Sequence, residues 1–108
     1  MTALRATITM TVARRDATRL LEGLRPVFAL AAQSPGFRQQ RITRAVSADP
    51  DMCVFVVTSD WADEGCFHAF ERSRKQDVAT AALRAVRTSS DMQLSMVNEP
   101  ARTGQVIA

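Results

Sequence analysis

The chain has 108 residues, 46% of them hydrophobic and 23% charged, which is typical of one soluble globular domain with a modest core. No apolar run approaches the roughly 20 residues that a membrane span requires, and the N-terminus lacks the features of a signal peptide. We therefore expect a cytoplasmic protein without membrane partners. The formal charge is +3, but the basic residues are scattered rather than clustered, which argues against nucleic-acid binding.

Two cysteines and one histidine limit the metal and redox chemistry. Cys53 and Cys66 lie on an expected strand and an expected helix, without Cys-x-x-Cys or Cys/His spacing. In the cytoplasm such a pair is most simply two reduced thiols packed in the fold. His68 is the only histidine, so we expect no metal site built by the protein.

The first expected element is a strand over residues 5–13, where apolar and polar residues alternate with a period of two. The apolar face holds Ala6, Ile8, Met10 and Val12, and the other face holds Thr7, Thr9 and Thr11. The threonine face is polar enough to line a cavity, although β-branched threonine also simply favours strands.

A helix is expected over residues 17–33, with Asp16 as its N-cap. Its apolar residues recur at helical spacing and form one stripe: Leu20, Leu21, Leu24, Val27, Phe28 and Ala31. Pro26 removes a hydrogen bond and clashes with the preceding turn, so we expect one kinked helix. Pro35-Gly36 then ends it.

A hairpin is expected next. Residues 37–47 form its first strand, and Asp49-Pro50-Asp51 is a turn in which aspartate side chains bond nearby backbone amides. Residues 52–58 are almost wholly apolar, which predicts a central strand buried on both faces.

The last third of the sequence predicts two short helices and a strand. The first helix begins at Ala62, carries Phe67 and Phe70 inward, and has acidic residues in its first turn. A second helical stretch covers residues 75–86, and residues 91–97 alternate as a final strand. We expect one domain over residues 1–108, with a core at about 5–98 and a loose tail at 99–108.

The order β-α-β-β-α-α-β predicts an α+β protein with the ferredoxin-like split β-α-β fold, an antiparallel sheet with helices on one face. Valine and threonine side chains from several strands occupy the other face. Because large exposed apolar patches are rare on monomers, we expect a homodimer to cover that face.

Four features together resemble the antibiotic biosynthesis monooxygenase family of small dimeric α+β barrels, over residues 5–98. They are Ser34-Pro35-Gly36-Phe37, the Asp49-Pro50 turn, Trp61, and Asp63-Glu64 before an aromatic helix. The resemblance implies a homodimeric α+β barrel that works without a cofactor. It also implies a monooxygenase that uses molecular oxygen to convert a small aromatic or polyketide-type phenol to a quinone.

The sequence departs from this family at one motif. Many members carry a histidine nine residues after this tryptophan, followed by Ser or Thr, Pro and another His, whereas here that first position is Phe70. Ser73 matches, but Arg74 and Lys75 replace the proline and the second histidine. The lone His68 is displaced by two residues and projects roughly 130° from the direction of Phe67 and Phe70. It is exposed, contacts a ligand, or contacts a dimer partner.

The resemblance suggests a site between sheet and helices. Its candidate substrate-binding residues are Trp61, Phe67, Phe70, Phe55 and Leu24, and its candidate catalytic residues are His68, Arg41 and Arg84. Arg41 or Arg84 would stabilise a substrate anion. His68 and Asp60 are poor candidates for the base. Trp61 and the two helical phenylalanines serve either the core or the substrate.

Other functions stay open on the same fold. A polyketide cyclase or isomerase, or a non-catalytic ligand-binding accessory protein, would have the same pattern of elements. Heme-degrading relatives share the fold, but they need a histidine ligand where this chain has Ala79. Heme degradation is therefore disfavoured.

Overall fold

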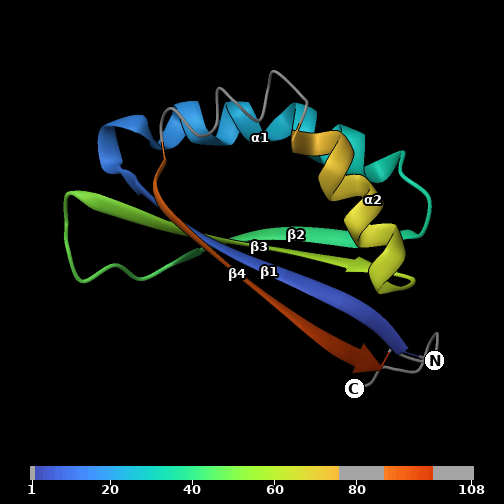
Figure 1. Cartoon of the computed structure of the whole chain (residues 1–108). Coiled ribbons are helices and arrows are strands. Elements are labelled where there is room, and N and C mark those ends of the chain that lie inside the picture. Colours follow the sequence, from blue (N-terminus) through green and yellow to red (C-terminus); the bar gives the residue numbers. More distant parts are fainter. Residues whose placement is uncertain (1, 76–86, 99–108) are drawn as a thin grey trace.

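The computed structural model describes residues 2–75 and 87–98, which form one antiparallel sheet with α-helices on one face (Figure 1). The elements in chain order are β1 (Thr2–Ala13), η1 (Arg14–Asp16), α1 (Ala17–Ala32), β2 (Phe37–Ala45), β3 (Met52–Trp61), α2 (Glu64–Lys75) and β4 (Arg87–Asn98). The strand order is β2-β3-β1-β4, which confirms the predicted ferredoxin-like α+β fold. In the described chain, neither helix is long and apolar enough to cross a membrane.

The predicted elements have the right type, but several of their ends are wrong. β1, β3 and β4 are longer than expected, and β2 ends at Ala45 rather than at residue 47. The predicted helix at 75–86 lies outside the described residues except for Lys75, where α2 ends. The predicted tail at 99–108 also lies outside them.

The start of α1 corrects the predicted cap. Asp16 occupies the N-cap position, but its side chain makes no cap hydrogen bond because the chain enters through the short 3-10 turn η1. Its carboxylate instead lies 3.4 Å from the Arg19 guanidinium. α1 then continues as one helix through Pro26, and Leu20, Leu24 and Val27 are buried against the sheet.

The two faces of the sheet differ in composition. We call the face covered by α1 and α2 the inner face, and the opposite one the outer face. β3 is a central strand, as predicted, but it is fully buried on the inner face only. Cys53, Phe55 and Val57 are buried there, whereas Val54 and Val56 are only partly buried on the outer face. Burial of β3 on both faces was therefore a wrong prediction for the single chain.

The Pro-Gly motif closes one end of the inner layer. Gly36 has a φ of 81°, and its carbonyl accepts a hydrogen bond from the Ala62 amide at 2.7 Å. A Cβ atom at Gly36 would collide with the Cys66 side chain, so only glycine fits between β2 and the start of α2. The Asp63 carboxylate caps α2 by accepting from the Cys66 amide at 2.8 Å, and this bond lowers the pKa of Asp63.

Candidate functional site

Trp61 is the centre of an aromatic cluster at the end of the inner layer where α2 begins. It ends β3 opposite Phe37 of β2, and the two rings meet edge to face with centroids 5.6 Å apart. From α2, Phe70 stacks on the indole at 4.9 Å and Phe67 approaches its edge at 6.0 Å. The indole N–H donates to the Ser59 hydroxyl at 2.9 Å, so the polar atom of this buried ring is satisfied.

The predicted substrate-binding residues come together on the inner face, but they are packed in the core. Trp61 and Phe67 are fully buried, and Leu24, Phe55 and Phe70 also expose less than a tenth of their surface. All five belong to one hydrophobic cluster. They therefore form a solid wall, and their contact with a substrate stays a prediction.

The exposed apolar surface of the inner face is on β4, and the sequence reasoning did not identify it. Met92 and Leu94 are 40% exposed and Met96 is 60% exposed. We call these three residues the β4 strip. They lie opposite Ile8, Ala6 and Leu4 of β1, whose side chains are on the inner face. The period-two alternation placed these residues on one face, but it could not show that the face is exposed at this edge strand.

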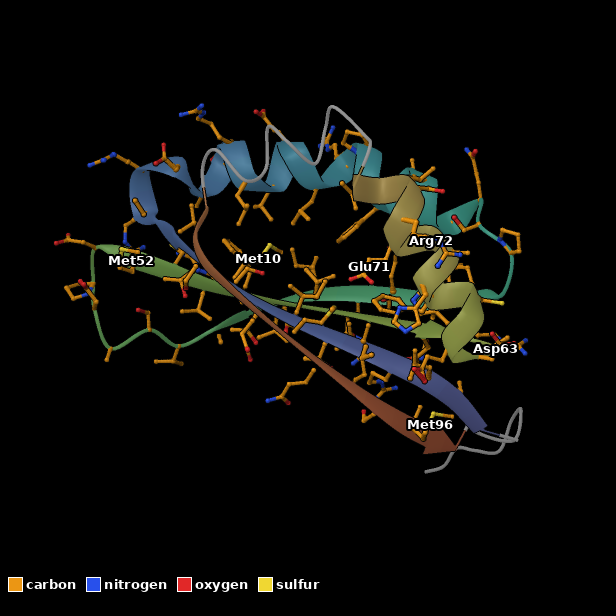
Figure 2. All side chains as sticks on the ribbon, viewed as in Figure 1. Met10, Met52, Asp63, Glu71, Arg72 and Met96 are labelled. Carbon is orange, nitrogen blue, oxygen red and sulfur yellow. The ribbon has the colours of Figure 1, made fainter. Side chains whose placement is uncertain are left out.

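A second feature that the sequence reasoning missed is Glu71 on α2. Its side chain is only 16% exposed, and Figure 2 shows it extending from α2 toward the layer between helices and sheet. The signal was available, because Glu71 follows Phe67 by four residues and therefore lies on the same side of the helix. The predictions had considered only His68 and Asp60 as bases.

His68 lies on the flank of α2 between two carboxylates. Its Nδ1 atom is 3.4 Å from Glu71 Oε1, and its Nε2 atom is 3.4 Å from Glu64 Oε2. The side chain is 41% exposed, and its ring lies 5.5 Å from the Phe67 ring. The helix geometry therefore places His68 at the rim of the aromatic wall, as the displacement predicts, in contact with both Phe67 and Glu71.

The predicted cationic residues do not join this group in the described chain. Arg41 faces Thr58 of β3, one residue from the inward Ile42, and so lies on the outer face. Arg84 lies outside the described residues. The structure therefore separates Arg41 from the aromatic wall by the thickness of the sheet.

Asp60 is also on the outer face, where it is held by an arginine. Arg5 donates two hydrogen bonds to its carboxylate, at 2.8 and 2.9 Å, and Gln39 donates a third at 2.8 Å. The Arg5 hydrogen bonds lower the pKa of Asp60 and outweigh the opposing effect of burial. A carboxylate stabilised in its ionised form is a weak base, and it faces away from the helices.

A separate pocket of about 440 Å³ opens at the other end of the sheet, beside the hairpin turn. Its charged lining residues are Arg14, which donates to the Pro50 carbonyl at 2.7 Å, and Arg44, which donates to Cys53 Sγ at 2.8 Å. Figure 2 places Met52, another lining residue, at the end of the molecule opposite to Asp63. Among the described residues, no group of three or more His, Cys, Asp or Glu side chains is arranged to hold a metal ion.

The fold and the inner layer together define a ferredoxin-like α+β protein with a hydrophobic face under two helices, and solved structures share this fold. A single-residue mutant of SnoaB from Streptomyces nogalater, described as a cofactor-independent oxygenase, superposes with a TM-score of 0.72 at 18% identity, over 91% of this chain and 96% of that one. A candidate antibiotic biosynthesis monooxygenase from Nitrosomonas europaea gives 0.71 at 13% identity, over 94% of each chain. A dimeric ferredoxin-like protein from an uncultured marine organism gives 0.70 at 8% identity, over 92% and 90%.

These similarities confirm, at the level of the fold, the resemblance to the antibiotic biosynthesis monooxygenase family. No protein-family model matches the sequence, and no curated protein was found to match it.

Proposed function

We propose that the protein is a cofactor-independent monooxygenase that oxidises a small phenolic or polyketide-type aromatic compound to a quinone. The observation that carries this proposal is that the helix side of the sheet holds both an exposed apolar strip on β4 and a partly buried carboxylate on α2. An apolar surface accepts a planar aromatic ring, and a positioned carboxylate accepts a proton from it. The fold shared with SnoaB, which is described as a cofactor-independent oxygenase, supports a reaction of the same general class.

The reaction needs no cofactor when the substrate supplies its own electrons. Loss of a proton from a phenol or its keto tautomer leaves an electron-rich anion, which reduces molecular oxygen and forms a carbon–oxygen bond to it. The resulting hydroperoxide loses water as the oxygen–oxygen bond breaks and the carbon becomes a carbonyl. One oxygen atom stays in the quinone, and the other leaves as water with the two hydrogens that the substrate gave up. The protein must bind the substrate, exclude bulk water from it and transfer protons.

In this proposal the buried aromatic cluster holds the residues of the site in position. The β4 strip provides the surface on which the substrate ring lies. Phe70 is the most exposed of the five predicted substrate-binding residues, at 8%, so we propose Phe70 as the member that contacts the substrate. Trp61, Phe67, Phe55 and Leu24 hold Phe70 and α2 in place. Arg84 keeps its predicted role as the group that stabilises the substrate anion.

We also propose that two copies of the chain pair through their outer faces. That face carries Thr7, Thr9, Val54 and Val56 in a partly exposed sheet surface, and one structure with this fold is described as dimeric. A C2 pair of sheets would cover these side chains in both copies at once. Sedimentation equilibrium of the purified protein tests this: a monomer at micromolar concentration would contradict it.

The experiment that tests the function is oxygen uptake by the purified, metal-free and flavin-free protein with dithranol, a hydroxylated anthrone, as the substrate. The expected result is consumption of one oxygen molecule per quinone formed, with one heavy oxygen atom in the product when the gas is isotopically labelled. A rearranged product without added oxygen would instead identify a cyclase or isomerase. Tight binding of dithranol without turnover above the uncatalysed rate would identify a binding protein.

A further inference from the structure

We propose that Glu71 is the proton acceptor of this reaction, and that His68 and Glu64 connect it to solvent as a proton relay along one flank of α2. The inference rests on the proposed function, because the proton that Glu71 accepts is the one whose loss activates the phenolic substrate. It answers the main objection to a catalytic role, which is that the only histidine does not face the inner layer.

The three side chains are ordered from the interior to the surface. Glu71 is 16% exposed, His68 is 41% exposed, and Glu64 is 64% exposed. Each ring nitrogen of His68 faces a different carboxylate, with Nδ1 toward Glu71 and Nε2 toward Glu64, both at 3.4 Å. The imidazole can therefore take up a proton at one nitrogen and release one from the other without rotating.

The spacing of these residues makes the arrangement a property of the helix. Glu64, His68 and Glu71 are separated by four and three residues, and side chains at these separations are neighbours on the surface of an α-helix. The start of α2 is fixed by the Asp63 cap and by the close approach of Gly36 to Cys66. A distance of 3.4 Å is long for a strong hydrogen bond, and such contacts commonly shorten when a substrate binds.

The position of Glu71 also restricts the class of substrate. An ordinary phenol is a much weaker acid than a carboxylic acid, so transfer of its proton to a carboxylate is strongly unfavourable. The substrate must therefore be a more acidic hydroxyarene or the keto tautomer of one, such as a hydroxylated anthrone, whose anion is delocalised over fused rings. Glu71 holds the proton while oxygen adds and returns it to the oxygen atom that leaves as water, so the relay consumes nothing.

The test compares the wild type with Glu71→Gln, His68→Gln and the matched control Glu22→Gln, an exposed glutamate on α1. For Glu71→Gln we expect kcat with dithranol to fall about 100-fold or more, KM to change little, and the rate to recover as rising pH ionises the substrate in solution. For His68→Gln we expect a fall of about tenfold, smaller than that of Glu71→Gln because Glu71 still accepts the proton. Fluorescence of Trp61, the single tryptophan, confirms that each variant is folded.

The outcomes separate this inference from the proposed function. If the wild type consumes oxygen and Glu71→Gln has the same kcat, the relay is wrong and the oxygenase assignment stands. If the wild type consumes no oxygen, the oxygenase assignment is wrong. Nitrogen NMR of His68 then still tests whether His68 and Glu71 are coupled. A changed Nδ1 resonance in Glu71→Gln, but not in Glu22→Gln, would support the coupling, and an unchanged one would overturn it.

Discussion

Two carboxylates on opposite sides of the sheet, one on a strand and one on a helix, show what decides the role of an acidic side chain in this fold. Asp60 on the outer face accepts two hydrogen bonds from Arg5 and one from Gln39, and its pKa is lowered. Glu71 on the inner side of α2 lies beside a histidine, a group that can exchange protons with it. Both side chains are largely removed from solvent, but Arg5 fixes the charge of Asp60, whereas the adjacent His68 can exchange a proton with Glu71.

The largest expected effect tests whether the inner wall is structural. Trp61→Ala should lower the free energy of unfolding by about 3–5 kcal/mol, because it removes a fully buried ring that contacts Phe37, Phe67 and Phe70. Trp61→Phe should cost clearly less, since it keeps the aromatic packing and loses only the second ring and the Ser59 hydrogen bond. Urea denaturation followed by circular dichroism measures both. Equal, small losses would mean that the wall is loosely packed and open to a substrate.

The wall also shows what the sequence could predict. Phe67 and Phe70 at positions i and i+3 predicted the inward face of α2 correctly, and the turn at Asp49 has the predicted bond, with its carboxylate accepting from the Asp51 amide at 2.9 Å. Both follow from local spacing. In the single chain β3 is fully buried on one face only, because an apolar run carries no information about whether the same chain or another copy covers each face.

The site was harder to predict than the fold. It depends on which face of a strand each residue occupies and on which strand lies at the edge of the sheet. Arg41 neighbours the inward Ile42, so a shift of one residue in the reading of β2 decides its face. Helical spacing alone aligns Glu71 with Phe67, but the family motif consists of histidine positions and does not include this residue. The exposure of Met92, Leu94 and Met96 depends on where the helices end above an edge strand, and local sequence does not specify that.

The second prediction concerns the carboxylate of Asp60 on the outer face. Asp60→Asn should lower the free energy of unfolding by about 1–2 kcal/mol, because Arg5 loses its charged acceptor. The Arg5 side chain is 37% exposed, so water compensates part of the loss. Activity per folded molecule should not change, because Asp60 faces away from the helices. A loss of turnover per folded molecule in Asp60→Asn would contradict the separation of the two faces.

The third prediction uses pH to measure how much the ion pair between Arg5 and Asp60 contributes to stability. The pKa of Asp60 in the folded protein is lower than the unfolded value of about 3.9, so its stabilising contribution is complete above that value. It should disappear as the pH falls through the folded pKa. The difference in unfolding free energy between the wild type and Asp60→Asn should therefore shrink below about pH 4. Arg5→Met should show the same loss of the acid-sensitive component. A difference that stays constant down to pH 2 would mean that the ion pair contributes little.

The smallest expected effect on stability tests the β4 strip, and it is the sharpest test of the inner face. Leu94→Ser should lower the free energy of unfolding by only about 1 kcal/mol, because the side chain is already 40% exposed. If the strip holds the substrate ring, the same substitution should raise KM for dithranol several-fold while kcat falls little, because it removes binding rather than proton transfer. The matched control is Leu21→Ser, an equally exposed leucine on α1. Glu71 would then act on kcat and Leu94 on KM, and a Leu94→Ser variant that loses kcat alone would show that the ring lies elsewhere on this face.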